Sequence, residues 1–303
     1  MTEQQPDVSI IISTKNRAEA IGPCIESIVH SIQHAGVVGE IVVVDNASTD
    51  GTAEELRKRA LGSTVPLKPV YESKSGTSAA RNAGIAAASG RLLVFTDDDC
   101  RLSTTYIAEA IKYDTADGPE AVFRSGSVVL GDTDDLPITI KLVTERRAWQ
   151  RPMDLTSEAQ ILGKSLIGCN MFLRRSTLEM IGRFDERLGP GTACRASEDT
   201  DYFYRAYLKG VRLEIVPDMV ISHFHGRKAE SDRTRLLVNY SFGNGALAMK
   251  YLFVYPNFSR HLYWMLKKPN GDKDFRWLPK KAMAAAQIEG ACLYACAVIF
   301  RRG

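Results

Sequence analysis

Short apolar runs alternate with helix-like stretches over the first hundred residues of the chain. The strand-like runs, rich in branched side chains, are residues 8–12, 41–44, 69–71 and 92–95. The helix-like stretches are residues 21–32, 52–61 and 77–88. Continuous apolarity is typical of strands buried on both faces, and strands that alternate with helices at this spacing form βαβ units. The pattern therefore predicts a parallel sheet covered by helices.

The pattern becomes more mixed after residue 100. The expected helices are residues 104–113, 138–149, 176–181 and 198–208, and the expected strands are residues 121–130, 166–172 and 211–216. Strand signals fade beyond His225, and we expect a helical tail interrupted at Pro256, Pro269 and Pro279. We therefore predict two parts, an α/β domain over residues 1–225 and a mostly helical extension over residues 226–303.

The charge of the chain is unevenly distributed. The 303 residues are 45% hydrophobic and 25% charged, which excludes a disordered or collagen-like chain. Residues 226–303 hold 14 Lys and Arg against 5 Asp and Glu, whereas residues 1–225 hold 25 against 31. A basic tail on an acidic body suggests contact with an anionic partner such as a membrane surface. The alternatives are helices that pack on the body with solvated lysines, or a homodimer contact.

The cysteines and the termini bear on the compartment. The six cysteines, none in a CxxC pair, are Cys24, Cys100, Cys169, Cys194, Cys292 and Cys296. This scatter predicts reduced thiols in a cytoplasmic protein, and we expect Cys292 and Cys296 to be packing residues, not metal ligands. The start of the chain lacks a signal-peptide pattern, and no apolar run approaches about 20 residues. We expect a soluble protein or one peripheral to the inner face of a membrane.

Three adjacent aspartates follow the strand-like run at residues 92–95. Ligands of open α/β sheets bind beyond the carboxyl ends of strands, and Asp45 ends a second run in the same way. In an extended chain Asp97 and Asp99 point to one side, where they could hold Mg²⁺ or Mn²⁺. The alternative is a solvated acidic turn that caps a helix near Ser103. We favour the metal site, because like charges so close together repel.

Three further segments could carry chemistry. Glu198 and Asp199 start an expected helix after a Gly-rich loop, where a carboxylate could act as a general base or only cap the helix. Arg81 lies on a helix after a run of small residues, where it could approach a diphosphate or belong to a solvated face or an ion pair. His223 and His225 alternate along a strand-like run, which suits a cation site or a solvent-facing pair.

Two apparent nucleotide-binding motifs lack their context. The aspartate run resembles a Walker B strand, but the chain has no G-x-x-x-x-G-K-[ST] loop. Residues 243–248 match G-x-G-x-x-A, but they lie in the tail with no preceding strand. We treat both as chance matches.

Taken together, the ordered motifs resemble those of the family 2 glycosyltransferases, inverting enzymes of the GT-A fold. The matching segments are residues 8–17, 40–52, 80–84, 93–99, 168–170, 182–186 and 197–201. The resemblance implies an α/β GT-A fold: a Rossmann-like, mostly parallel central sheet flanked by helices, here with a C-terminal helical extension. One departure is Cys100, which stands where the family commonly has a further acid.

The resemblance also implies roles for individual residues. The nucleotide and its diphosphate would be contacted by Thr14, Asn16, Asp45, Arg81, Asp97 and Asp98. The metal ligands would be Asp97, Asp99 and His223, with His225 a weaker alternative. Asp199 would be the catalytic base, with Glu198 in a supporting or shared role. The sugar or acceptor would be contacted by Asn170, Asp185 and Glu186.

We therefore expect a glycosyltransferase that uses Mn²⁺ or Mg²⁺ and inverts the anomeric centre. Its donor would be a nucleotide-diphosphate sugar, with a UDP-sugar favoured, and its acceptor a glycan or lipid-linked hydroxyl in bacterial-type surface polysaccharide synthesis. One alternative is a catalytically idle GT-A module that binds nucleotide sugar or glycan as a scaffold. Another is a nucleic-acid-binding protein that uses the basic tail, but the tail contains no recognisable module for it, and we expect no nucleic-acid partner.

Overall fold

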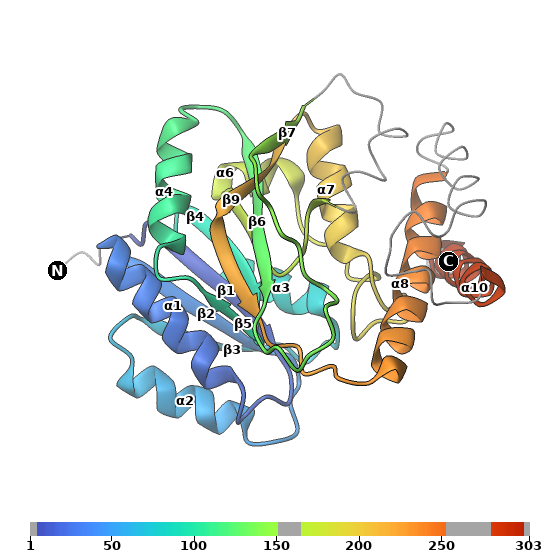
Figure 1. The fold of residues 1–303 in the computed structure, drawn as a ribbon, viewed down its shortest axis with the longest axis horizontal. Coiled ribbons are helices and arrows are strands. Elements are labelled where there is room, and N and C mark those ends of the chain that lie inside the picture. The colour runs from blue at the N-terminus through green and yellow to red at the C-terminus, as the bar shows by residue number, and fades with distance from the viewer. Residues whose placement is uncertain (1–4, 151–164, 253–279, 300–303) are drawn as a thin grey trace.

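The computed structural model describes residues 5–150, 165–252 and 280–299. A nine-stranded sheet with helices on both faces is its central feature (Figure 1). The strands are β1 (Val8–Thr14), β2 (Gly39–Asp45), β3 (Leu67–Tyr71), β4 (Leu92–Asp97), β5 (Cys100–Leu102), β6 (Val122–Leu130), β7 (Arg147–Trp149), β8 (Met171–Arg174) and β9 (Arg212–His223). The helices are α1 (Ile21–Ala35), α2 (Thr52–Gly62), α3 (Thr77–Ala87), α4 (Tyr106–Ala116), α6 (Arg175–Ile181), α7 (Glu198–Leu208), α8 (Glu230–Leu252) and α10 (Lys280–Ile299).

The sheet combines a parallel half with a mixed half. The strand order is β3-β2-β1-β4-β8-β6-β9-β5, and β7 also pairs with β9. Strands β3, β2, β1 and β4 are parallel to one another, whereas β8 runs antiparallel between β4 and β6. The predicted α/β class, a central sheet flanked by helices with further helices at the C-terminal end, is confirmed. The parallel order holds for the half built from the first hundred residues.

The two faces of the sheet bury separate hydrophobic cores. Along β1, Ile10 and Ile12 belong to one core and Ile11 to the other, because successive side chains of a strand alternate between faces. The first core also contains the apolar stripe of α1, including Ile25 and Ile28. Helices α1, α2 and α4 cover this face, and α3, α6 and α7 cover the other (Figure 1). Nearly every residue of β1, β2 and β4 is buried, as their continuous apolarity predicts.

The prediction of a helix over residues 138–149 is wrong. The backbone of Lys141 pairs with Val128 of β6, and residues 147–149 form β7 against β9. The Val143 N–H also donates to the Ser127 hydroxyl at 3.0 Å. The strands β6 and β9 thus offer backbone and side-chain partners that outweigh the helical spacing of the apolar residues.

Two strands differ from the predicted bounds. Residues 166–170 are not part of a strand, because the chain turns there before β8 starts at Met171. Strand β9 extends well beyond residue 216 and ends at His223. Its register with β6 shifts between Gly126 and Ser127, which accommodates the irregular segment around Pro217. This longer β9 carries His223 to the predicted site.

The C-terminal helices α8 and α10 pack against each other with very little space between their backbones. A side chain at Gly245 would place its Cβ 1.9 Å from the carbonyl oxygen of Gln287, and one at Gly290 would lie 2.0 Å from that of Phe242. The expectation that Cys292 and Cys296 are packing residues is wrong, since both are exposed on α10. The three prolines expected to interrupt the tail lie outside the described residues.

Ion pairs and hydrogen bonds join this helix pair to the rest of the chain. The Lys250 ammonium of α8 lies 2.7 Å from a carboxylate oxygen of Asp185 and 2.6 Å from one of Asp201 on α7. The Tyr251 hydroxyl donates to Asp201 at 3.0 Å, and the Tyr294 hydroxyl of α10 reaches Asp185 at 3.4 Å. The boundary that we predict at residues 225/226 falls between β9 and α8.

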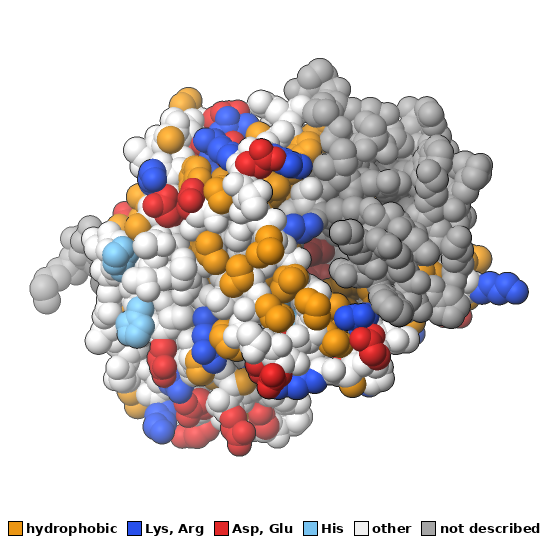
Figure 2. Space-filling model, in the orientation of Figure 1, with side chains coloured by type: hydrophobic (Ala, Val, Ile, Leu, Met, Phe, Trp, Pro, Cys, Tyr) orange, Lys and Arg blue, Asp and Glu red, His pale blue; other side chains and the backbone are white. Residues whose placement is uncertain are grey.

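The charge distribution on the viewed face is mixed. Figure 2 shows acidic and basic side chains interspersed there, with apolar side chains between them. Within the ranges that the structure describes, no helix combines the length and apolarity needed to cross a membrane.

The contact between the C-terminal helices can be tested at Gly245. We expect Gly245→Ala to lower the free energy of unfolding by about 1–3 kcal/mol, the usual cost of overpacking, and to speed amide hydrogen exchange in α8 and α10. Chemical denaturation and hydrogen-exchange mass spectrometry measure both effects. Gly62→Ala, at the end of α2 with no neighbouring atom within 4 Å, is the matched control. Equal stability of the two variants would contradict this packing.

Candidate active site

The carboxyl ends of three parallel strands gather polar side chains at one edge of the sheet. β1 ends at Thr14, β2 at Asp45 and β4 at Asp97. Thr14 and Asp45 are buried, and the side chain of Asp97 keeps 36% of its surface exposed. Because ligands of open α/β sheets bind beyond this edge, the three residues delimit the candidate site.

Asp98 and Asp99 form a turn between β4 and β5, and the extended conformation expected for the aspartates is therefore wrong. The Thr14 hydroxyl donates to Asp98 at 2.7 Å, and a carboxylate oxygen of Asp99 lies 3.2 Å from Nε2 of His223. The Arg17 guanidinium lies 3.5 Å from Asp98 and 3.7 Å from Asp99. The turn thus directs these two carboxylates to different partners.

The pKa values of this turn reflect burial and pairing. Burial raises the pKa of Asp98 to about 6, although the Thr14 hydrogen bond and Arg17 oppose the shift. Burial also raises the pKa of Asp97 against the effect of Arg81. For Asp99, burial is outweighed by the His223 hydrogen bond and charge, so its pKa is lowered. Burial lowers the pKa of His223, but the bond to Asp99 dominates and raises it to about 9.

Arg81 links the aspartate turn to the start of α7. Its guanidinium donates to Glu198 at 3.0 Å, to Asp97 at 3.4 Å and to the Gly168 carbonyl oxygen at 3.2 Å. Its side chain is only 4% exposed. The solvated-face alternative for Arg81 is therefore wrong, because the side chain is a buried cation held between two carboxylates.

Glu198 and Asp199 differ in their surroundings. Glu198 is buried, and burial together with the neighbouring charge of Asp199 raises its pKa to about 7, despite the opposing effect of Arg81. Asp199 is half-buried, and its carboxylate accepts hydrogen bonds from the backbone N–H of Gly168 at 3.1 Å and of Thr200 at 2.6 Å. Asp199 is therefore the more accessible of the two carboxylates.

Hydrogen bonds connect the loops that follow β1 and β2. Asn16 adopts a left-handed conformation, φ 55°, and its side-chain oxygen accepts from the Thr49 N–H at 2.8 Å. The Asn16 N–H donates to the Ser48 hydroxyl, and the Ser48 N–H donates to Asp45 at 3.0 Å. Of the residues expected to contact the nucleotide, Asn16 thus holds the two loops together, and Asp45 shapes the second loop.

The placement of Asn170 contradicts the expected substrate contact. Its side chain is completely buried, its oxygen accepts from the Tyr106 hydroxyl at 2.7 Å, and its amide donates to the backbone of Ser127 and Met219. These bonds fix the irregular pairing of β6 with β9.

His225 likewise stabilises a neighbouring segment. Its Nε2 lies 3.1 Å from the Leu136 carbonyl oxygen, and its Nδ1 accepts from the Arg227 N–H at 3.0 Å. The weaker metal-ligand alternative for His225 therefore finds no support in its surroundings.

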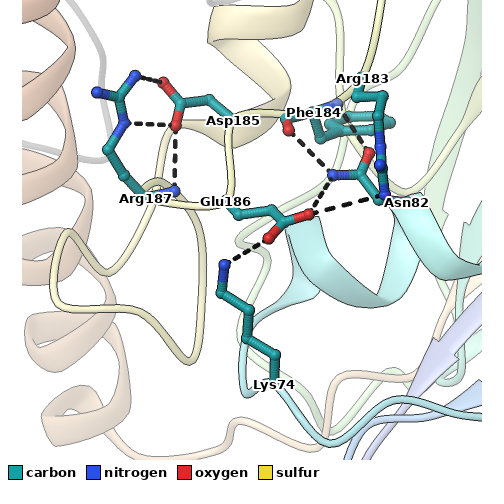
Figure 3. Close-up of a pocket in the computed structure, with 7 residues that line it drawn as sticks. All are labelled: Lys74, Asn82, Arg183, Phe184, Asp185, Glu186 and Arg187. Atoms are coloured by element: carbon teal, nitrogen blue, oxygen red, sulfur yellow. Dashed lines mark hydrogen bonds and ion pairs between the residues drawn. The ribbon is translucent and has the colours of Figure 1, made fainter.

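Asp185 and Glu186 line a pocket of about 420 Å³ beside α3, which contributes Asn82 to its lining (Figure 3). Asp185 is bonded to Arg187 and Lys250, and these cations outweigh its burial and lower its pKa. Its oxygens hold the C-terminal helices, and the substrate contact of Asp185 stays a prediction. Glu186 is less buried than Asp185, and its carboxylate accepts hydrogen bonds from the side chains of Lys74 and Asn82 in this pocket.

Three contributors to the site were not predicted individually. Arg17 pairs with the aspartate turn, and the backbone of Gly168 contacts both Arg81 and Asp199. Cys169 lies beside Cys100 and His223. Arg17 and Gly168 both fall inside segments that carry the family resemblance, but the sequence alone does not indicate which residues they meet.

The acids at this edge fit a hard divalent cation. Asp97, Asp98, Asp99, Glu198 and Asp199 together carry more negative charge than Arg17, Arg81 and a protonated His223 can neutralise. Carboxylate oxygens are the donors that Mg²⁺ and Mn²⁺ prefer. Burial, with a smaller effect of Asp99 and Asp199, raises the pKa of Asp97 although Arg81 opposes the shift, and a bound cation would favour its charged form. In the described structure His223 is a hydrogen-bond partner of Asp99.

The fold and this edge together define an α/β protein of the GT-A type. The family model for Glycosyl transferase family 2 matches residues 9–182, more than half of the chain, and the protein belongs to that family. The predicted family is thus confirmed.

Curated relatives match part of the chain. Glycosyltransferase AglE of Haloferax volcanii is 33% identical over 122 residues, which are 40% of each chain. Succinoglycan biosynthesis protein ExoU of Rhizobium meliloti is 29% identical over 226 residues, covering 71% of this chain and 61% of that protein. The chain thus spans less than two thirds of either relative's length.

Solved structures share the fold at low sequence identity. Residues 1–349 of S. aureus TarS superpose with a TM-score of 0.62 at 16% identity, covering 95% of this chain and 83% of that one. The mannosyltransferase PcManGT of Pyrobaculum calidifontis, solved with GDP-Man and Mn²⁺, gives 0.59 at 22% identity, covering 98% and 87%.

Removal of the Arg81 charge tests the link between the turn and α7. We expect Arg81→Met to lower the free energy of unfolding by about 3–5 kcal/mol, because two carboxylates lose their buried partner. Arg57→Met, which removes an exposed ion pair with Glu54 on α2, should change it by about 1 kcal/mol or less. Urea unfolding of both variants provides the measurement. The Arg81 prediction fails if the two variants lose similar stability.

The raised pKa of Glu198 predicts a pH dependence of stability. The folded chain holds this proton up to about pH 7, whereas an unfolded glutamate releases it near 4.5. The contribution of Glu198 to stability is therefore largest at low pH and declines as the pH rises through that window. The free energy of unfolding of Glu198→Gln, taken relative to that of wild type, should therefore rise as the pH increases from 5 to 8. Urea unfolding of both proteins across this pH range provides the measurement. A difference between their free energies of unfolding that stays constant with pH would refute the prediction.

Proposed function

We propose that the chain is a divalent-metal-dependent, inverting glycosyltransferase that moves a sugar from a nucleoside-diphosphate donor to an acceptor hydroxyl. The observation that supports this proposal is the Arg81 contact, which joins Asp97 at the end of β4 to Glu198 at the start of α7. The names of the relatives, which include succinoglycan and teichuronic acid biosynthesis proteins, favour a role in polysaccharide or lipid-linked glycan synthesis.

Asp199 is the general base in this proposal. It is half-buried, and its carboxylate is oriented by the backbone N–H groups of Gly168 and Thr200. From there it can take the proton of the acceptor hydroxyl as that oxygen attacks the anomeric carbon, on the face opposite the leaving diphosphate. Glu198, the preceding residue, is buried in an ion pair with Arg81, and this contact positions α7. General base catalysis of this kind contributes about 10²–10⁴ in rate.

The donor would lie along the edge formed by β1, β2 and β4. Asp45 would accept a hydrogen bond from the nucleotide base, while Thr14 and Asn16 hold the surrounding loops and Arg81 adds positive charge near the diphosphate. Asp97 and Asp99 would hold Mn²⁺ or Mg²⁺, with Asp98 and His223 as their supporting partners. Such an ion supplies charge neutralisation for the departing nucleoside diphosphate. Glu186, in the pocket of Figure 3, is proposed for acceptor contact.

Two substitutions test the proposal. We expect Asp199→Asn and Asp99→Asn each to lower sugar transfer by about 10²–10⁴. The assay incubates the full chain with a panel of UDP- and GDP-sugars and Mn²⁺, Mg²⁺ or a chelator, and measures nucleotide release. Glu54→Gln, an exposed acid on α2, serves as the matched control and should retain wild-type turnover. Undiminished transfer in Asp199→Asn would overturn the role of the base.

Donor binding separates this proposal from an idle scaffold. A ligand that binds only the folded state stabilises it by RT ln(1 + [L]/Kd), so a tighter donor gives a larger rise in thermal stability. Asp199→Asn should keep the stabilisation by donor and Mn²⁺, whereas Asp99→Asn should lose most of it. Stabilisation of the wild-type chain without any nucleotide release would instead favour the scaffold. The anomeric configuration of the product, measured by NMR, tests inversion.

A further inference from the structure

Two cysteines and a histidine converge beside the aspartate turn. The Sγ atoms of Cys100 and Cys169 and a ring nitrogen of His223 all lie within 4.8 Å of one another. All three residues are buried, with exposures of 0%, 3% and 6%. Buried cysteines are often simple packing residues, but here two thiols face an imidazole and not only apolar side chains.

Three separate elements of the fold bring these residues together. Cys100 is the first residue of β5 and stands directly opposite His223, the last residue of β9, in their antiparallel pairing. Cys169 lies in the turn before β8. The sheet itself holds Cys100 and His223, and Cys169 lies two residues before β8, which pairs with β6 as β9 does. Strand pairing therefore fixes two of the three positions, and the third lies in a turn that adjoins a strand.

The donor set favours a thiophilic cation. Sulfur and imidazole ligands are typical of Zn²⁺, whereas Mg²⁺ and Mn²⁺ prefer oxygen. Ligands at about 2.0–2.3 Å from a tetrahedral Zn²⁺ stand about 3.3–3.8 Å apart. Because the three ligand atoms lie within 4.8 Å of one another, they would have to approach by at most about 1.5 Å. A fourth donor is close by, because Oδ1 of Asp99 lies 3.8 Å from the Cys100 sulfur and 3.2 Å from Nε2 of His223.

We propose that Cys100, Cys169 and His223 form a binding site for Zn²⁺ or a similar thiophilic divalent cation, with Asp99 as the fourth ligand. Binding releases the two thiol protons and the extra imidazole proton to solvent. The site differs in ligand chemistry from the carboxylate site for Mn²⁺ or Mg²⁺, but the two share Asp99. Where the proposed function holds, Zn²⁺ at the thiol site would therefore inhibit transfer by withdrawing Asp99 and His223.

Co²⁺ provides a spectroscopic probe that is independent of sugar transfer. The full chain, reduced and carrying Cys292→Ser and Cys296→Ser to remove the exposed thiols of α10, is titrated with Co²⁺. We expect one ion per chain, a thiolate-to-cobalt charge-transfer band and the visible bands of tetrahedral Co²⁺, all displaced by Zn²⁺. Cys100→Ser and Cys169→Ser should each abolish the charge-transfer band or weaken binding by more than the roughly 10–100-fold typical of a lost outer-shell partner. Cys194→Ser, at a buried cysteine outside the cluster, should retain both.

A second measurement uses the cysteines in place and needs no variant that might misfold. Zn²⁺ should slow alkylation of Cys100 and Cys169 at least about tenfold, as followed by mass spectrometry under partly denaturing conditions, because a metal-bound thiolate is no longer free to react. Mg²⁺ should not. The proposal is overturned if both serine variants bind Co²⁺ as tightly as the parent chain with an undiminished charge-transfer band, or if no band forms and Zn²⁺ leaves the alkylation of these two cysteines unchanged. A failed transfer assay with a normal Co²⁺ spectrum would count against the proposed function alone.

Discussion

The buried guanidinium of Arg81 is the interaction on which the candidate site depends. Three elements distant in sequence meet at it: β4 through Asp97, the turn before β8 through Gly168, and α7 through Glu198. A buried cation and its carboxylates gain little net stability, because each loses its hydration, but the removal of one partner leaves the others uncompensated. The arrangement therefore fixes relative position more than it adds stability. Burial, and to a smaller extent Asp199, raises the pKa of Glu198 even with Arg81 beside it.

The same principle applies three residues further along α7, at Asp201. Asp201 is completely buried, and it is contacted by Lys250 and Tyr251 of α8 and by Arg205 of its own helix. Asp185, in the loop before α7, is held by Lys250 as well. Helix α7 thus has charged partners in both the sheet domain and the C-terminal helices. The basic composition of the extension suggests an anionic partner outside the chain. For Lys250, however, the anionic partners are carboxylates of the same chain.

The sequence predicted most of the fold and the elements that carry the site, but not the side-chain contacts. Strands β1, β2 and β4 and helices α1 and α7 follow from apolar runs and helical spacing, since local pattern and tertiary burial agree there. The segment 138–149 was mispredicted because its strand partners lie far away in sequence, where periodicity carries no information. Asn170 and Asp185 were expected at the substrate because they fall in family-like motifs. Their bonds to Tyr106 and Lys250 depend on how distant elements pack.

The irregular pairing of β6 with β9 has a consequence for how such a site can vary. The register shift between Gly126 and Ser127 is fixed by the buried Asn170 amide, which bonds to Ser127 and Met219 on either side of it. One residue gained or lost in β9 before this point would be absorbed at the shift or would turn His223 to the opposite face of the sheet. The contact between His223 and Asp99 therefore depends on the number of residues in β9 as much as on the His223 side chain. Changes to that length, and not only substitutions at the site, can alter the charge available to the aspartate turn.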